Sequence, residues 1–112
     1  MAAAVRAGVA GEEVAPAPVD TEVANALRAR VRLGQISAAD GRRLLDTYRW
    51  MAVTRHNVLA MCDRIWELRD KVTAYDAAYV ALAEAIECSL VTADARLGQV
   101  RGLCCPVTVV PG

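Results

Sequence analysis

The chain has 112 residues, 55% of them hydrophobic, and its 13 basic and 13 acidic side chains give a formal net charge of zero. This length suits one small domain, and this apolar content supports a buried core and argues against disorder. The balanced charge argues against a broad cationic nucleic-acid surface, although it leaves room for a local one.

The cysteines give little support for a metal site. Cys62, Cys88, Cys104 and Cys105 form no C-x-x-C pair, and the chain has a single histidine, so a zinc site is poorly supplied. We expect reduced thiols, with Cys104 and Cys105 as buried strand residues rather than a disulfide.

No segment of the sequence resembles a membrane span or a leader. No apolar run approaches the roughly 20 residues that a spanning helix needs. The apolar start of the chain is short, is broken by Arg6 and is followed by acidic residues, which is not typical of a signal peptide. We expect a cytoplasmic protein with no membrane association.

The first elements are punctuated by glycine and proline. Residues 2–10 are predicted to form a short helix that ends at Gly11, and residues 12–17 a short extended segment followed by Pro18.

Residues 19–34 are predicted to form a helix. Asp20 and Glu22 lie in its first turn, where the helix dipole favours anions, and Gly34 is a natural stop. Its apolar residues recur at helical spacing and form one face: Val19, Val23, Ala26, Leu27 and Val31.

The rest of the chain alternates between helical and extended patterns. Helices are predicted at 37–51, 57–70, 73–87 and 94–100, and strands at 51–56, 88–92 and 105–110. Short apolar strands that alternate with helices are typical of an α/β fold, a parallel sheet flanked by helices.

Two aspartates stand at informative places in this pattern. Asp76 opens the helix at 73–87, and Asp94 follows the strand at 88–92. Because that helix and strand run in opposite directions, we expect the two carboxylates to return to the same edge of the sheet. In open α/β sheets this edge, at the carboxyl ends of the strands, is where ligands bind.

The segment "TAYDAAYVALAEAIECSLVTADARL" at 73–97 resembles the C-terminal acidic signature of PIN-domain proteins, specifically the VapC-type toxins of bacterial toxin–antitoxin pairs. The resemblance extends back through "WELRD" and "APAPVDTEVANALRARVRLGQIS" and covers nearly the whole chain. The spaced pattern T-A-Y-D-A-x-Y with a later T-A-D is more specific than any single acidic residue.

The resemblance implies a PIN-like fold and an endoribonuclease that uses Mg²⁺ or Mn²⁺ held by a cluster of acids. Glu22, Asp76 and Asp94 fall on acidic positions of the family, and Thr92 falls where the family often has a hydroxyl beside the last acid. The family also implies an RNA substrate, a cognate VapB-type antitoxin and a homodimer.

The chemistry of the three acids agrees with this implication. Mg²⁺ prefers oxygen ligands, typically a few carboxylates with water and substrate phosphate. We expect Asp76 to be a direct ligand, with Glu22 and Asp94 completing the field or binding through water.

Each acid also has a structural interpretation. An aspartate at a helix start is often a cap, one after a strand is often a turn former, and Glu22 could simply favour the helix dipole. We expect structural roles for four further residues, with Tyr75 and Tyr79 as packing residues and Glu84 and Glu87 on a solvated helix face.

The chain departs from the family at its start. The family begins with an apolar strand, central in its sheet, that ends in an aspartate, and neither has a counterpart here. We therefore expect residues 1–112 to be a single PIN-like domain shortened at its N-terminus by roughly twenty residues. A start codon placed too far downstream, a degenerate gene or a persisting shortened protein would each explain this.

Two functions follow from these expectations. The first is a toxin that cleaves RNA as a metal-dependent endoribonuclease. The alternative is a catalytically inactive, truncated PIN protein that only binds an antitoxin.

Overall fold

The computed structural model describes residues 3–6 and 13–111, and its contacts divide the chain into two compact units. One unit comprises residues 1–17 and 53–112, and the other residues 18–52. The prediction of a single PIN-like domain over 1–112 stays a prediction.

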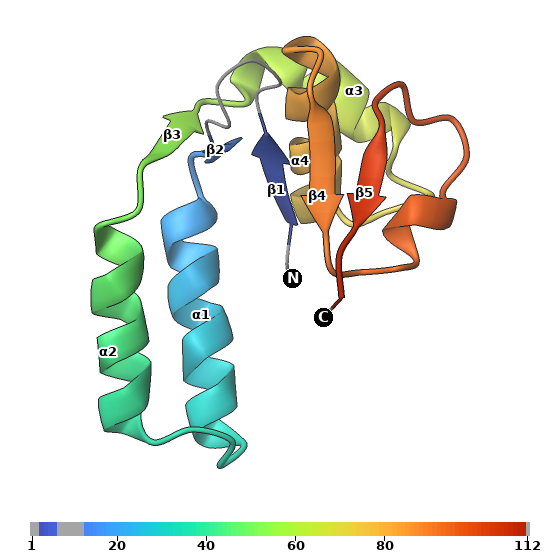
Figure 1. The fold of residues 1–112 in the computed structure, drawn as a ribbon. Helices are drawn as coiled ribbons and strands as arrows, with labels where there is room; N and C mark the ends of the chain where they lie inside the picture. Colours follow the sequence, from blue (N-terminus) through green and yellow to red (C-terminus); the bar gives the residue numbers. More distant parts are fainter. Residues whose placement is uncertain (1–2, 7–12, 112) are drawn as a thin grey trace. The chain divides into compact units, whose positions relative to one another are not determined.

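The first unit is built on a five-stranded sheet in the order β3-β2-β1-β4-β5 (Figure 1). Its strands are β1 (Ala3–Arg6), β2 (Glu13–Pro16), β3 (Val53–His56), β4 (Ser89–Thr92) and β5 (Val107–Val109). The pairs β2–β3 and β4–β5 are parallel, and β1 runs antiparallel to both of its neighbours, β2 and β4.

The predicted α/β class is confirmed, but the start of the chain differs from expectation. Residues 3–6 form a strand rather than part of a helix. Alanine has a high helix propensity, but propensity is only a weak guide to structure. Strand pairing with both neighbours outweighs it here.

The prediction that the central strand is missing is corrected in the same region. Strand β1 fills the middle of the sheet, where Val5 is in register with Val14 on one side and Leu90 on the other. It is antiparallel because the six residues between Arg6 and Glu13 are too few for the crossover that a parallel pair requires.

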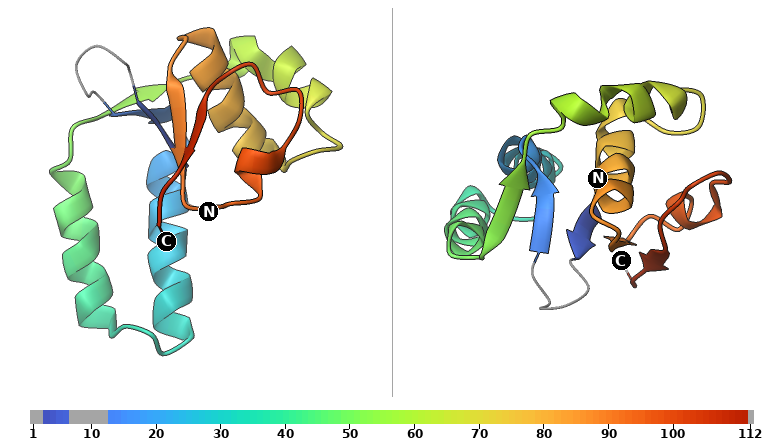
Figure 2. Two further views of the ribbon diagram at one scale, coloured as in Figure 1. Left: turned by 45° about the vertical axis from the view of Figure 1, so that its right-hand side comes forward. Right: turned by 90° about the horizontal axis from the view of Figure 1, so that it is seen from above.

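Helices cover one face of this sheet (Figure 2). The chain passes through η1 (Leu59–Met61), α3 (Cys62–Glu67) and α4 (Ala74–Ala85), and a later short helix, η2 (Leu97–Gln99), precedes β5. Helix α4 packs on β1, β2 and β4, and α3 packs on α4. In α4, Ala77 and Tyr79–Ala83 are buried, and with Leu68 and Leu90 they form much of the core.

The second unit is a pair of helices, α1 (Val19–Arg32) and α2 (Ala38–Arg49), which lie side by side (Figure 1). Gly34 ends α1 in the left-handed conformation, with φ of 74°. Ser37 caps α2, since its side chain accepts a hydrogen bond from the Asp40 N–H at 3.0 Å. Gly41 lets the helices approach, because a Cβ there would lie 3.1 Å from Val31 Cγ2.

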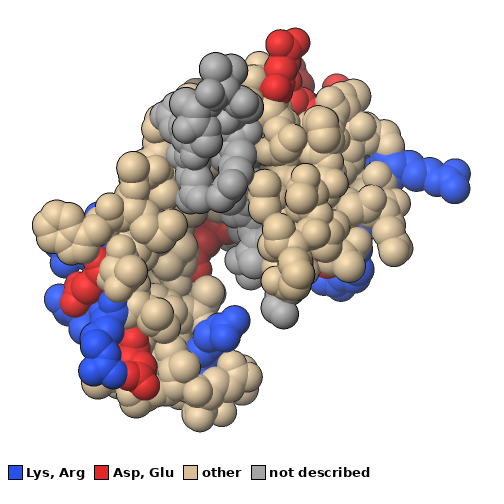
Figure 3. All heavy atoms as spheres, in the orientation of Figure 1, with Lys and Arg blue, Asp and Glu red and all other residues tan. Residues whose placement is uncertain are grey.

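Charges of both signs are interleaved on the visible surface of this helix pair (Figure 3). Arg42 and Arg49 both pair with Asp46, and Arg43 pairs with Asp40. The surface of α2 is therefore not a broad cationic face, in agreement with the balanced composition. None of the described helices is long and apolar enough to cross a membrane.

Candidate active site

A pocket of about 460 Å³ lies in the first unit, beside the start of α4 and the end of β4. Two segments line it, 69–76 and 94–100, and each contributes one aspartate, Asp76 and Asp94. The expectation that these two carboxylates return to the same edge of the sheet is therefore met. Their part in a reaction stays a prediction.

Asp76 is placed by the capped start of α4. Thr73 is the N-cap, and its hydroxyl accepts a hydrogen bond from the Asp76 N–H at 3.2 Å. Ala77, the next residue, is completely buried against the core. The burial of Ala77 fixes the rotation of the helix and holds the half-buried Asp76 at the pocket wall.

Asp94 is placed by the turn that follows β4. The buried Thr92 accepts a hydrogen bond from the Asp94 N–H at 3.0 Å through its hydroxyl. Asp94 Oδ1 in turn accepts from the Arg96 N–H at 2.9 Å, which closes a local turn of the kind that aspartate favours. Asp94 is thus a turn former as well as a pocket residue.

The two carboxylates have opposite electrostatic environments. Burial, together with the negative charge of Asp94, raises the pKa of Asp76 above its ordinary value. Hydrogen bonds from the Arg96 side chain and backbone lower the pKa of Asp94. The charged form of Asp76 is therefore the less stable of the two carboxylates, and a nearby cation would stabilise it.

This arrangement fits a hard divalent cation. Mg²⁺ is typically held by one or two carboxylates together with water and substrate phosphates, and the pocket offers Asp76 and Asp94 for that purpose. Among the described residues, no group of three or more His, Cys, Asp and Glu side chains gathers at one place.

Glu22, the third predicted acid, lies in the first turn of α1 in the second unit. It is half-buried, and its N–H donates to the Pro18 carbonyl at 3.1 Å. The aspartates belong to the other unit, so a cluster of all three acids stays a prediction.

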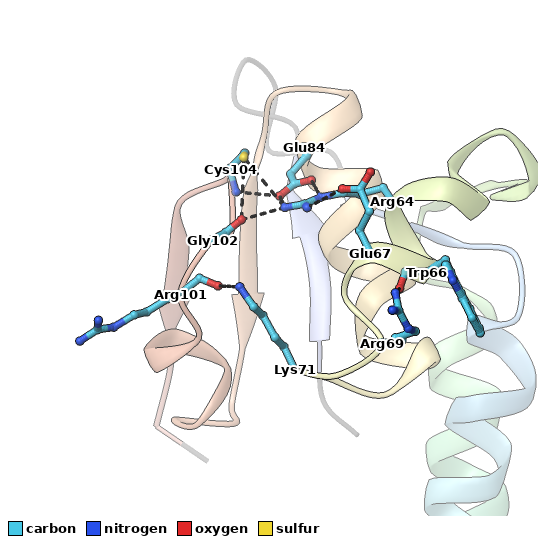
Figure 4. Close-up of polar contacts among 9 residues, drawn as sticks. All are labelled: Arg64, Trp66, Glu67, Arg69, Lys71, Glu84, Arg101, Gly102 and Cys104. Carbon is cyan, nitrogen blue, oxygen red and sulfur yellow. Dashed lines mark hydrogen bonds and ion pairs between the residues drawn. The ribbon is translucent and has the colours of Figure 1, made fainter.

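The sequence did not predict an ion pair between Arg64 on α3 and Glu84 near the end of α4 (Figure 4). The prediction of a solvated helix face was right for the exposed Glu87 and wrong for Glu84, whose side chain is 12% exposed. The signal was present, since Glu84 continues the buried stripe of Ala77, Val80 and Ala81 at helical spacing.

Two other expectations on packing need correction. Tyr79 is buried as predicted, but Tyr75, which lies one turn earlier in the first turn of α4, is 66% exposed. Cys104 is exposed and Cys105 half-buried in the loop before β5, rather than in a strand. All four cysteines are free thiols.

Comparison with known proteins agrees with this architecture. Residues 2–103 match the model of the PIN domain family. VapC ribonuclease Mb0985 of Mycobacterium bovis is 53% identical over 96 residues, which cover 86% of this chain and 76% of that protein. Ribonuclease VapC1 of Mycobacterium tuberculosis is 38% identical over 111 residues, covering 96% of this chain and 84% of the relative.

A third relative extends the agreement. Ribonuclease VapC12 of Mycobacterium tuberculosis is 39% identical over 101 residues, or 89% of this chain and 78% of the relative. The family match over residues 2–103 includes α1 to α4 and both pocket segments. The chain therefore belongs to the PIN-domain family, among the VapC-type proteins.

Proposed function

We propose that this protein is the toxic component of a type II toxin–antitoxin system and acts as a Mg²⁺-dependent endoribonuclease. The observation that carries the proposal is the pocket that holds Asp76 and Asp94 in a chain 53% identical to a VapC ribonuclease. PIN-domain VapC nucleases generally depend on a divalent metal. Mg²⁺ or Mn²⁺ suits the oxygen donors of this pocket.

Asp76 is the direct metal ligand in this proposal, with Asp94 beside it and Glu22 as the third acid. Asp76 is well suited because burial and the neighbouring charge of Asp94 disfavour its carboxylate and raise its pKa, and a bound cation would offset both effects. The bound ion would activate water and neutralise charge as the phosphodiester bond breaks.

The chain's own residues prepare the pocket for this chemistry. Thr73 and Thr92 fix the backbone of the two aspartates through their hydroxyls. Lys71 Nζ donates to the Arg101 carbonyl at 2.7 Å and ties the segment before α4 to the loop before β5. This bond links the pocket segment 69–76 to the residue that follows the pocket segment 94–100, which would help to hold the two segments together.

The proposal includes two protein partners. A VapB-type antitoxin would bind the chain and suppress its activity, and the chain would form a homodimer. RNA is the expected substrate. The VapC relatives support the antitoxin and the RNA substrate, and the homodimer stays a prediction that can be measured directly.

Cleavage of RNA by the full chain tests the proposal. We expect Mg²⁺-dependent cleavage that EDTA stops. Asp76→Asn should reduce the cleavage rate at least a hundredfold, whereas Asp63→Asn should cleave at the wild-type rate. Asp63 is the matched control, because it is an exposed aspartate in the first turn of α3 outside the pocket.

Normal cleavage by Asp76→Asn would refute the assignment of the site. Tight binding of a VapB-type antitoxin by a chain that cleaves no RNA with any divalent ion would favour the inactive binding protein instead.

A further inference from the structure

Arg96 holds both oxygens of the Asp94 carboxylate. Its Nε lies 3.2 Å from Oδ1 and its Nη2 lies 3.1 Å from Oδ2, so the contact is bidentate. Oδ1 also accepts the Arg96 N–H at 2.9 Å. A planar guanidinium matches a carboxylate in this way, and it matches a phosphate equally well.

The two aspartates differ in how many acceptor positions they have left for a cation. A carboxylate oxygen has two favourable acceptor positions, and Asp94 Oδ1 has both occupied by Arg96. Asp94 can therefore offer a cation little more than one position on Oδ2 while this contact lasts. Asp76 lines the same pocket, and Arg96 acts on its carboxylate through charge alone, with no hydrogen bond between these two described residues.

The Arg96 side chain can leave Asp94 at little cost. It is 91% exposed, whereas that of Asp94 is 33% exposed, so the contact is a surface ion pair with water on one side. Such pairs contribute little to stability. The guanidinium is thus held over the pocket by Asp94 and is not embedded in the core.

The other two basic side chains that line the pocket have partners elsewhere (Figure 4). Arg69 stacks over the ring of Trp66 at 4.9 Å and donates to the Trp66 carbonyl at 3.0 Å. Lys71 donates to the Arg101 carbonyl. Within the described pocket, Arg96 is the basic side chain whose partner is a catalytic acid.

We propose that Arg96 is a phosphate-binding positioning residue that alternates between two partners, Asp94 in the free protein and a phosphate of the RNA in the complex. The inference rests on the proposed function. A divalent cation held by Asp76 and Asp94 would compete with the Arg96 guanidinium for Asp94. The released guanidinium would then be available to pair with a phosphate of the RNA backbone.

Two binding measurements on the full chain test this exchange, and neither requires turnover. The first is Mn²⁺ affinity by electron paramagnetic resonance. The second is affinity for a 2′-O-methyl RNA oligonucleotide at several salt concentrations. The variants are Arg96→Ala, Arg96→Lys and the control Arg101→Ala. Arg101 belongs to the same unit, does not line the pocket, and points its side chain away from the labelled residues in Figure 4.

Arg96→Ala should bind Mn²⁺ about threefold to tenfold more tightly, because the competing cation is gone, and bind the oligonucleotide about tenfold more weakly. The slope of log affinity against log salt should fall by about 0.7, the value for one phosphate contact on a single strand. Arg96→Lys should have Mn²⁺ and RNA affinities between those of wild type and Arg96→Ala, because lysine keeps the charge but lacks the two-point guanidinium contact. Arg101→Ala should match wild type in both measurements.

Unchanged or weaker Mn²⁺ binding by Arg96→Ala, or a loss of RNA affinity no larger than that of Arg101→Ala, would overturn the inference and leave the ribonuclease proposal standing. A wild-type chain that binds no Mn²⁺ would overturn both. Since Arg96 is 91% exposed, the variants should melt at the wild-type temperature, which circular dichroism checks.

Discussion

Arg64 on α3 and Glu84 on α4 face each other across the two helices, with Nε 2.7 Å from Oε1 and Nη2 3.0 Å from Oε2. The same two side chains also hold the loop before β5. Arg64 Nη2 donates to the Gly102 carbonyl at 2.8 Å, and Glu84 Oε2 accepts from the Cys104 N–H at 2.7 Å. One ion pair therefore joins α3, α4 and the segment that leads to the last strand (Figure 4).

Replacement of Glu84 by glutamine should destabilise the protein by about 2 kcal/mol, since the partly buried Arg64 loses its two-point charged partner and keeps only the exposed Glu67. Chemical unfolding followed by circular dichroism measures this difference. Glu87→Gln, at the exposed end of the same helix, is the matched control and should change stability by less than about 0.5 kcal/mol. Equal unfolding midpoints for the two variants would contradict the role of the pair.

The same pair should make stability depend on acid pH. The hydrogen bonds from Arg64 lower the pKa of Glu84 below its ordinary value of about 4.3. A depressed pKa in the folded state gives stability that is present above the ordinary pKa and is lost as pH falls through the lowered one. Between pH 5 and the acid limit of about pH 2, wild type should lose more unfolding free energy than Glu84→Gln. Parallel curves for the two proteins would refute this.

The sequence predicted the fold well where local signals agree with packing. Helices were predicted to begin at residues 37 and 73, and in the structure Ser37 and Thr73 cap α2 and α4, each by accepting a hydrogen bond from a backbone N–H. The strand at residues 3–6 was not predicted because four residues of alanine, valine and arginine show no decisive periodicity. Its pairing with β4 also depends on residues 89–92, far along the chain.

Thr92 should matter to the site through its hydroxyl alone. Thr92→Val keeps the shape of a 2% exposed side chain but removes the acceptor for the Asp94 N–H. We expect a loss of about 1 kcal/mol in stability and Mn²⁺ affinity severalfold weaker than wild type, because Asp94 is less well placed. Thr92→Ser retains the acceptor and should bind Mn²⁺ as wild type does. Equal Mn²⁺ affinity for the valine and serine variants would contradict this positioning role.

Asp94 should influence the titration of Asp76. Burial is the larger cause of the raised pKa of Asp76, and the charge of Asp94 is the second. Asp94→Asn should therefore lower the pKa of Asp76 while leaving it above the ordinary aspartate value of about 3.9. Carbon-detected nuclear magnetic resonance of the side-chain carboxyl measures the change, with Asp63→Asn as the control. A pKa of Asp76 that is insensitive to Asp94→Asn would show that the two charges are not coupled.

The sequence placed Asp76 and Asp94 at one edge because a helix and the strand after it run in opposite directions, and the pocket bears this out. It did not predict the Arg64–Glu84 pair or the hold of Arg96 on Asp94. Both depend on side-chain directions that spacing alone leaves open. Glu22 shows the same limit, because its position relative to the aspartates depends on how α1 joins the sheet, which no local pattern encodes.

The location of the bound ion tests the central claim most directly. Mn²⁺ added to the ¹⁵N-labelled chain should broaden amide signals in two stretches, residues 73–77 and 92–97, and Asp76→Asn should abolish the broadening while Asp63→Asn preserves it. Broadening centred elsewhere, or broadening that persists in Asp76→Asn, would contradict a divalent-cation site built on Asp76 and Asp94.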